Sequence, residues 1–223
     1  VMRTHVRKIN FFRISEGALG KLVLKTAAAT VSLIIAFGLI LFGIVSLASP
    51  SAMMAFADSL AMDGLSAYYS IAIYERTGEI SDLAAAVERS YDVEHYSDAA
   101  KYGEQLLSDS GFAAYCIERD EDTAGNAGVI SSYEQYAAGI VSSAQYHAGE
   151  KESALETALD ALGQNTFPER NAMYYLSSAA TSSGDVAFCR EMLSSLEKLT
   201  VEDVQEQVRL QEFITDLQIF CAE

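Results

Sequence analysis

The sequence predicts an all-α protein in which one N-terminal transmembrane helix precedes an array or bundle of shorter helices. The 223-residue chain contains two prolines and is rich in Ala, Leu, Glu and Ser, a composition that favours helix. Runs of β-branched residues are few, and no stretch alternates apolar and polar residues for long enough to indicate a strand. Helix is therefore expected throughout the chain.

The membrane span is predicted over residues 26–48, which are 23 consecutive uncharged and mostly apolar residues. At ~1.5 Å per residue such a helix extends about 34 Å, enough to cross a hydrocarbon core ~30 Å thick. Residues 1–25 carry a net charge of +5, whereas the residues after the span carry −21, from 9 basic and 30 acidic side chains. By the positive-inside rule, residues 1–25 are a cytoplasmic basic leader and residues 50–223 an acidic extracytoplasmic domain. The expected location is the cell membrane, crossed once.

Residues 26–48 are interpreted as an uncleaved signal anchor that contacts the lipid bilayer. The alternative is a cleaved secretory signal, which has an apolar stretch of only ~7–15 residues. The run in this chain is longer, and Pro50 would obstruct cleavage if it followed the scissile bond. A buried helix of a soluble protein is disfavoured because the run is apolar on all faces.

Small residues share one face of the predicted span and would allow another transmembrane helix to approach closely. Three recur every four residues and the fourth falls seven further on: Ala28, Ser32, Ala36 and Gly43. This face is therefore a predicted packing surface. The alternative is that such residues are simply common in spans, since no GxxxG motif occurs, and the sequence leaves the oligomeric state open.

The acidic composition of the exported part excludes some partners. A nucleic-acid binder needs Lys and Arg to displace phosphate counterions, so no nucleic-acid partner is expected. No Asn-x-Ser/Thr sequon occurs, and this absence, with the Ala- and acid-rich composition, favours a bacterial envelope protein.

Three cysteines, Cys116, Cys189 and Cys221, follow the span. In an oxidising compartment one pair could form a disulfide. Cys189 with Cys221 is the preferred pair because both lie on neighbouring predicted helices near the end of the chain. Otherwise the cysteines are expected to be small buried apolar residues.

Caps and punctuation residues predict the helices of the exported part. Ser49-Pro50 begins the first, which runs to Thr77 and ends at Gly78. Residues 121–128, with two glycines, are predicted to be a loop. Between these points three helices are expected, over 81–90 with Ser81 as cap, over 97–109 opened by Ser97, and over 112–120.

In the later part of the chain, capping residues and helix-ending glycines occur at more regular intervals. Two are expected over residues 131–148 and 151–162, ending at Gly149 and Gly163. Thr166 and Glu169 fit a capping box that opens a helix ending at Ser183-Gly184, and Asp185 caps another to about Lys198. Thr200 opens the last helix, whose apolar positions 201, 204, 208, 210, 214, 217 and 219/220 lie close to one amphipathic stripe.

The hairpin turns recur at a nearly fixed period. The turn glycines Gly78, Gly111, Gly149 and Gly184 are 33, 38 and 35 residues apart, a spacing typical of helix–turn–helix solenoids. Around the last two turns, an apolar residue stands eight before, a small residue seven before and another five after: Val141 and Leu176, Ser142 and Ser177, Ala154 and Cys189. In these positions the chain resembles the tetratricopeptide family over residues 131–199.

The resemblance implies an α-α hairpin array closed by the terminal helix, residues 201–220. The earlier hairpins fit less well, since Leu83 and Cys116 occupy the position five after Gly78 and Gly111. The chain also has no Trp for the aromatic start position of the family. A generic antiparallel helical bundle is the alternative.

Tyrosine is concentrated after the span, because all 12 tyrosines follow residue 67. The resemblance implies that the first helix of each hairpin lines a groove, and Tyr133, Tyr136, Tyr174 and Tyr175 would lie on such helices. Tyrosine is rigid and amphipathic and suits interfaces, so these four are the predicted partner-binding residues. The alternative is that most rings pack between helices with the hydroxyl at the surface.

No catalytic residue, cofactor or metal ligand is predicted. The chain lacks GxSxG, HExxH, CxxC and phosphate-loop motifs, and its three histidines have no metal-ligand spacing. A cell-wall hydrolase built on carboxylates alone would need an acid pair that the sequence does not identify. The protein is therefore expected not to be an enzyme.

Two functional hypotheses follow. The first is a membrane-anchored extracytoplasmic helical-repeat adaptor that mediates protein–protein interaction or envelope complex assembly with other envelope or membrane proteins. The second is a structural accessory subunit of a membrane transport or secretion complex, assembled through its transmembrane helix. Substitutions at the four tyrosines should impair the first function, and substitutions on the small-residue face of the span the second.

Overall fold

The computed structural model of the chain describes residues 12–124, 132–163 and 165–222. Within these ranges it contains eleven helices and no strand, which confirms the predicted all-α class. The chain divides into two compact units, residues 1–49 and 50–223.

The first unit contains one long helix, α1 (Phe12–Ala48). Residues 23–46 form the one stretch, among the residues that the structure describes, that is long and apolar enough to cross a membrane. None of this stretch is buried against the rest of the protein, which suits an apolar helix surrounded by lipid. Its small residues at positions 28, 32, 36 and 43 lie on one helix face, and a role for them in helix packing stays a prediction.

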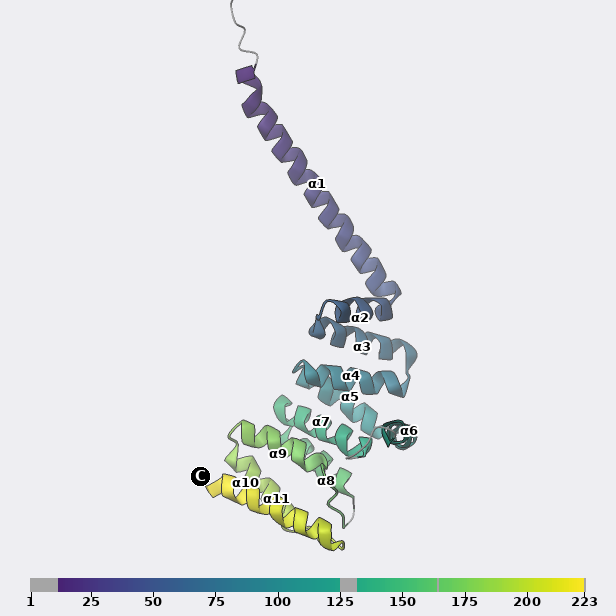
Figure 1. Cartoon of the computed structure of the whole chain (residues 1–223), viewed down its shortest axis with the longest axis vertical. Coiled ribbons are helices and arrows are strands. Elements are labelled where there is room, and N and C mark those ends of the chain that lie inside the picture. The colour runs from purple at the N-terminus through teal and green to yellow at the C-terminus, as the bar shows by residue number, and fades with distance from the viewer. Residues whose placement is uncertain (1–11, 125–131, 164, 223) are drawn as a thin grey trace, which may run out of the picture. The chain divides into compact units, whose positions relative to one another are not determined.

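The second unit is an array of antiparallel-packed helices that follow one another in chain order in Figure 1. The central helix is α7, which packs against α5, α8 and α9. The helices are α2 (Pro50–Ser59), α3 (Asp63–Thr77), α4 (Ile80–Asp92), α5 (Tyr96–Ser108), α6 (Phe112–Ala124), α7 (Tyr133–Ala148), α8 (Lys151–Leu162), α9 (Ala172–Ser182), α10 (Val186–Leu196) and α11 (Val204–Ala222).

Several of the predicted helix ends are confirmed. Gly78 and Gly149 end α3 and α7 in the left-handed conformation, with φ of 66° and 91°. Glycine is required there because L side chains rarely adopt positive φ. Asp185 caps α10 as predicted, since its carboxylate accepts a hydrogen bond from the Phe188 N–H at 3.2 Å. These ends were predictable because each depends on one local residue.

The prediction of a single helix over residues 50–77 is wrong. α2 ends at Ser59 and α3 begins at Asp63, and between them Ala61 has a φ of 51°. The break allows α2 to fold back on α3, with Met53 and Ala57 buried. Residues 60–62 contain neither Gly nor Pro. The helix breaks there because packing of the two apolar faces outweighs the local preference for helix.

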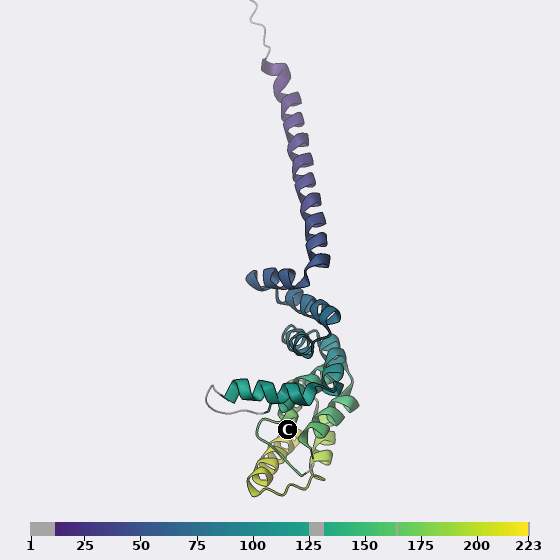
Figure 2. The same cartoon turned by 90° about the vertical axis from the view of Figure 1, so that its right-hand side faces the viewer.

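The helices on either side of Gly111, α5 and α6, do not form the predicted hairpin. In Figure 1 α6 is seen end-on, whereas in Figure 2 it is seen along its length, so it runs crosswise to α7. It therefore does not pack as an antiparallel partner of α5. The helix continues to Ala124, so the first residues of the predicted loop 121–128 are helical, and residues 125–128 lie outside the described residues.

The predicted start of α9 is wrong as well. The Thr166 hydroxyl donates to the Leu162 carbonyl instead of capping a helix. The cap is Asn171, which is fully buried, accepts from the Met173 N–H at 3.0 Å and donates to the Pro168 carbonyl at 2.8 Å. Residues 165–171 instead belong to a connection that places Phe167 in the core.

The helices α4, α5 and α11 begin at residues other than the predicted caps. Helices α4 and α5 start one residue before Ser81 and Ser97, and their N-cap residues make no side-chain cap bond. Helix α11 starts after Asp203, whose carboxylate accepts from the N–H groups of Gln205 and Glu206, both at 2.9 Å. Thr200 is therefore not the cap of this helix.

The apolar stripe predicted along α11 combines two different faces. The buried face of the helix consists of Leu210, Phe213, Ile214 and Leu217. Val204, Val208 and Ile219 are instead 71%, 53% and 56% exposed. Leu210, Phe213, Ile214 and Leu217 face α10, Phe167 and Tyr174, and Val204, Val208 and Ile219 are left uncovered by the residues that the structure describes.

Two main hydrophobic clusters hold the array together. One is formed by residues of the elements from α7 to α11 and includes Phe167, Met173 and Met192. The other is formed by residues of the elements from α4 to α7 and includes Leu83 and Leu106. The positions that carry the tetratricopeptide resemblance are all buried: Val141, Ser142, Ala154, Leu176, Ser177 and Cys189. The packing is compatible with a helical repeat.

Candidate partner-binding surface

Three of the four predicted partner-binding tyrosines come together in the structure. Tyr133 and Tyr136 lie on α7, and Tyr175 lies on the adjacent helix α9. The ring centroids of Tyr133 and Tyr136 are 5.8 Å apart, and those of Tyr136 and Tyr175 are 5.9 Å apart. These distances are typical of aromatic contacts, so the three rings form one continuous row.

The fourth tyrosine, Tyr174, lies in a separate hollow. Its ring packs edge-on against Phe213 of α11, with centroids 4.7 Å apart. Together with residues of α9 and α11, including Thr181 and Leu217, it lines a pocket of about 360 Å³. Consecutive helical residues point in directions about 100° apart, which is why Tyr174 and Tyr175 reach different neighbours.

A carboxylate on α4 completes the tyrosine row. The Tyr133 hydroxyl donates a hydrogen bond to Glu88 Oε1 at 2.7 Å. The Tyr133 ring also contacts Tyr115 of α6 edge-on, at 5.4 Å, and the Arg119 guanidinium lies 5.3 Å from its centroid. Tyr133 is only 8% exposed, so it joins α4, α6 and α7.

Tyr136 and Tyr175 are different, because each is only partly buried. Within the part of the chain that the structure describes, no hydrogen bond is made by either hydroxyl. Tyr133 therefore has a role in the fold through its hydroxyl, whereas Tyr136 and Tyr175 contribute their rings. Partner binding by any of the four tyrosines stays a prediction.

Burial raises the pKa of all three tyrosines in the row, and nearby carboxylates raise it further for Tyr133 and Tyr136. Burial, and then the charge of Glu88, raises the pKa of Tyr133 far above its ordinary value. Burial, with the charges of Glu88 and Asp92, raises the pKa of Tyr136 to about 12. Burial also raises the pKa of Tyr175. At neutral pH all three hydroxyls therefore carry a proton that can be donated.

A polar pocket adjoins the tyrosine row and shares Glu88 with it. Its volume is about 310 Å³, and its lining residues are Asp63, Ser66, Glu88, Arg89, Asp92 and Val93. The one basic residue among them, Arg89, is paired with Asp58 at 2.8 Å. We call Glu88, Asp92, Tyr136 and Tyr175 together the tyrosine–acid surface. Its two carboxylates are negative and its two hydroxyls are neutral donors, and the charge of Arg170 acts on Tyr175 from nearby.

Sequence reasoning missed Glu88 and Tyr115. Glu88 lies 45 residues before Tyr133, so no local spacing indicates their contact. Tyr115 was one of 12 tyrosines, and only the crosswise course of α6 brings it to Tyr133.

The cysteines are free thiols in this structure. Cys189 of α10 is buried, and Cys221 of α11 packs against the same hydrophobic cluster. Burial, with the proximity of Cys221, raises the pKa of the Cys189 thiol to about 11, so it is protonated and unreactive at neutral pH. The pairing of Cys189 with Cys221 stays a prediction. Among the described residues, no group of three or more His, Cys, Asp and Glu side chains is placed to hold a metal ion.

We expect Tyr133→Phe to destabilise the second unit by about 1–2 kcal/mol, because it removes a hydrogen bond to a charged and partly buried carboxylate. Urea unfolding of the detergent-solubilised chain, followed by tyrosine fluorescence, measures this change. The matched control is Tyr68→Phe, because Tyr68 is 62% exposed and its removal should change stability by less than about 0.5 kcal/mol. Equal effects of the two substitutions would contradict the structural role of Tyr133.

Comparison with protein-family models, curated proteins and solved structures found no match to this chain. The class of this protein is therefore described from its fold and its surface alone. It is an all-helical protein with one N-terminal helix that is apolar and long enough to span a membrane. An antiparallel-packed helical array follows, with an acidic, tyrosine-bearing surface.

Proposed function

We propose that the protein is a membrane-anchored extracytoplasmic adaptor whose tetratricopeptide-like array binds another envelope or membrane protein. The observation that carries this proposal is the tyrosine–acid surface. There Tyr136 and Tyr175 offer neutral hydroxyls that make no hydrogen bond within residues 12–124, 132–163 and 165–222, beside the carboxylates of Glu88 and Asp92. Tyrosine is enriched at protein interfaces, and stacked helical repeats present extended surfaces for partners.

The surface also favours a particular kind of partner segment. Its carboxylates complement Lys or Arg side chains, and its tyrosine rings can receive a cation on their faces. An acidic partner would meet like charges and be rejected. We therefore expect a basic segment of another protein to bind there.

The test is quantitative capture of partners by the full chain from solubilised membranes, comparing the wild type with a Tyr136→Phe/Tyr175→Phe double variant. These substitutions keep both rings and remove only hydroxyls that make no hydrogen bond in the described part of the chain, so the array should remain intact. Loss of two neutral hydrogen bonds of ~1 kcal/mol each should weaken capture by about tenfold or more. Tyr68→Phe, on an exposed ring of α3, is the matched control and should capture normally.

The second candidate is an accessory subunit that assembles through its membrane helix. The observation that favours it is the open small-residue face of α1, where nothing lies within 4 Å of a Cβ built on Gly43. Ser32→Leu and Ala36→Leu fill this face and should abolish assembly if the span carries it. Loss of capture in these variants, with normal capture in the tyrosine double variant, would overturn the adaptor proposal.

A further inference from the structure

The segment between the apolar helix α1 and helix α3 has an unusual composition. Residues 49–62 read SPSAMMAFADSLAM and contain one charged side chain, Asp58, in a unit whose net charge is strongly negative. Helix α2 begins at Pro50, only two residues after α1 ends at Ala48. The segment therefore follows the proposed span directly.

The one charge in this segment is compensated inside the fold. Arg89 of α4 donates from Nη1 to Asp58 Oδ1 at 2.8 Å and from Nη2 to Oδ2 at 3.3 Å. The Ser66 hydroxyl donates to the same carboxylate. Arg89 and then Ser66 hold the pKa of Asp58 below its ordinary value, so the ion pair persists at neutral pH. The segment presents no uncompensated charge.

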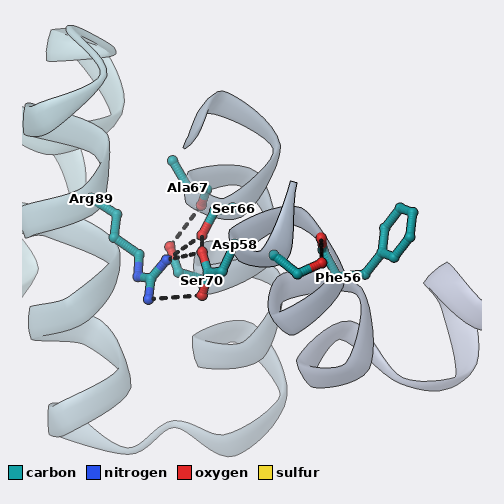
Figure 3. A network of polar contacts seen from close by, with 7 residues as sticks. Phe56, Asp58, Ser66, Ala67, Ser70 and Arg89 are labelled. Atoms are coloured by element: carbon teal, nitrogen blue, oxygen red, sulfur yellow. Dashed lines mark hydrogen bonds and ion pairs between the residues drawn. The ribbon is translucent and has the colours of Figure 1, made fainter. Parts of the chain in front are cut away.

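The segment also carries exposed apolar side chains. Figure 3 shows the Asp58 carboxylate directed at Arg89, while the Phe56 ring points away from this network on the other side of α2. Phe56 is 49% exposed, Leu60 54% and Met62 46%, whereas Met53 and Ala57 are buried within the fold. The described residues therefore leave about half of each of these three large apolar side chains uncovered.

Chain connectivity limits how far these side chains can lie from the membrane. Two Cα–Cα steps of ~3.8 Å lead from Ala48 to Pro50, and six helical steps of ~1.5 Å lead on to Phe56. Phe56 therefore lies within about 17 Å of the end of α1. The headgroup region on each side of a bilayer is ~5–8 Å thick, so Phe56 is within reach of it.

We propose that α2 and the turn at residues 60–62 lie in the membrane interface, with Phe56, Leu60 and Met62 inserted among the lipids. The occupant of this apolar face is the leaflet next to the second unit. The insertion is apolar and does not depend on anionic lipid, because residues 49–62 contain no basic side chain. It rests on the proposed membrane anchoring of α1.

The chain contains no Trp, so a single introduced Trp reports its own surroundings. The full chain is reconstituted in phosphatidylcholine vesicles with lipids brominated on the acyl chains, which quench Trp by contact. We expect Phe56→Trp and Leu60→Trp to emit at shorter wavelength and to be quenched several-fold more than Ile117→Trp. Ile117 is the matched control because it is 62% exposed on α6, remote in sequence from α1.

A Trp reporter in the middle of the span tests the membrane anchoring of α1 separately from the interfacial position of α2. Phe37→Trp should be strongly quenched if α1 spans the bilayer, and absence of quenching there would overturn the anchoring itself. Quenching of Phe37→Trp, with Phe56→Trp and Leu60→Trp behaving like Ile117→Trp, would overturn the interfacial position of α2 and leave the anchor intact. Two reporters in the segment ensure that one poorly folded variant does not decide the result.

Discussion

Replacing Phe167, the largest fully buried side chain among the described residues, by alanine should destabilise the second unit by about 3–5 kcal/mol. Phe167 is fully buried although it belongs to the connection between α8 and α9. Its ring packs against Phe213 of α11, with centroids 5.6 Å apart, and its N–H donates to Glu206 Oε2 at 2.8 Å. Truncation would leave a cavity where α9 and α11 meet.

The measurement is urea unfolding of the detergent-solubilised full chain, followed by tyrosine fluorescence. This signal reports the second unit because all 12 tyrosines follow residue 67 and the chain has no Trp. Phe56→Ala is the control, since Phe56 is 49% exposed and its truncation should cost less than about 1 kcal/mol in detergent. Similar losses in the two variants would show that Phe167 does not anchor α11.

Gly103→Ala should also destabilise the unit, although alanine favours helix over glycine by ~1 kcal/mol. A Cβ on Gly103 would lie 2.4 Å from Cγ2 and 2.9 Å from Cγ1 of Val141, both well below van der Waals contact. Both atoms belong to a β-branched side chain with little freedom on α7, so α5 must shift away from it. Overpacking of this kind costs about 1–3 kcal/mol, which exceeds the gain in helix propensity.

Gly64→Ala is the matched control, because its Cβ would meet only the His95 Cε1 atom at 4.0 Å. That variant should be neutral or more stable by up to ~1 kcal/mol in the same urea experiment. A double-mutant cycle with Val141→Ala tests the contact directly, since Gly103→Ala should cost little once the valine methyls are gone. An unchanged cost in the Val141→Ala background would contradict close packing of α5 on α7.

Much of the architecture could be read from the chain because it depends on neighbouring residues. The apolar run within α1 is recognised by length and charge alone. Gly78 and Gly149 end helices because their backbone conformation excludes most side chains, and Asp185 caps the helix that follows it. These features are local, so one residue or one short run decides each of them.

The features that sequence reasoning missed all depend on contacts between distant residues. The break between α2 and α3 has no Gly or Pro and is decided by burial of Met53 and Ala57. Asn171 replaces Thr166 as the cap of α9, with its side chain fully buried in the fold. The same holds for the stripe on α11, where packing against α10, Phe167 and Tyr174 selects one of two apolar faces.

The candidate surface likewise combines features that the sequence predicts with features that depend on contacts between distant residues. The sequence by itself determined that tyrosines and acids are concentrated after the apolar run and that the pattern favours helix over strand. Only the tertiary structure decided that Glu88 meets Tyr133, that Tyr136 and Tyr175 form one row, and that Tyr174 turns to α11. The reason is physical: composition and helix period are properties of short segments, whereas the choice of neighbour depends on how whole helix faces pack.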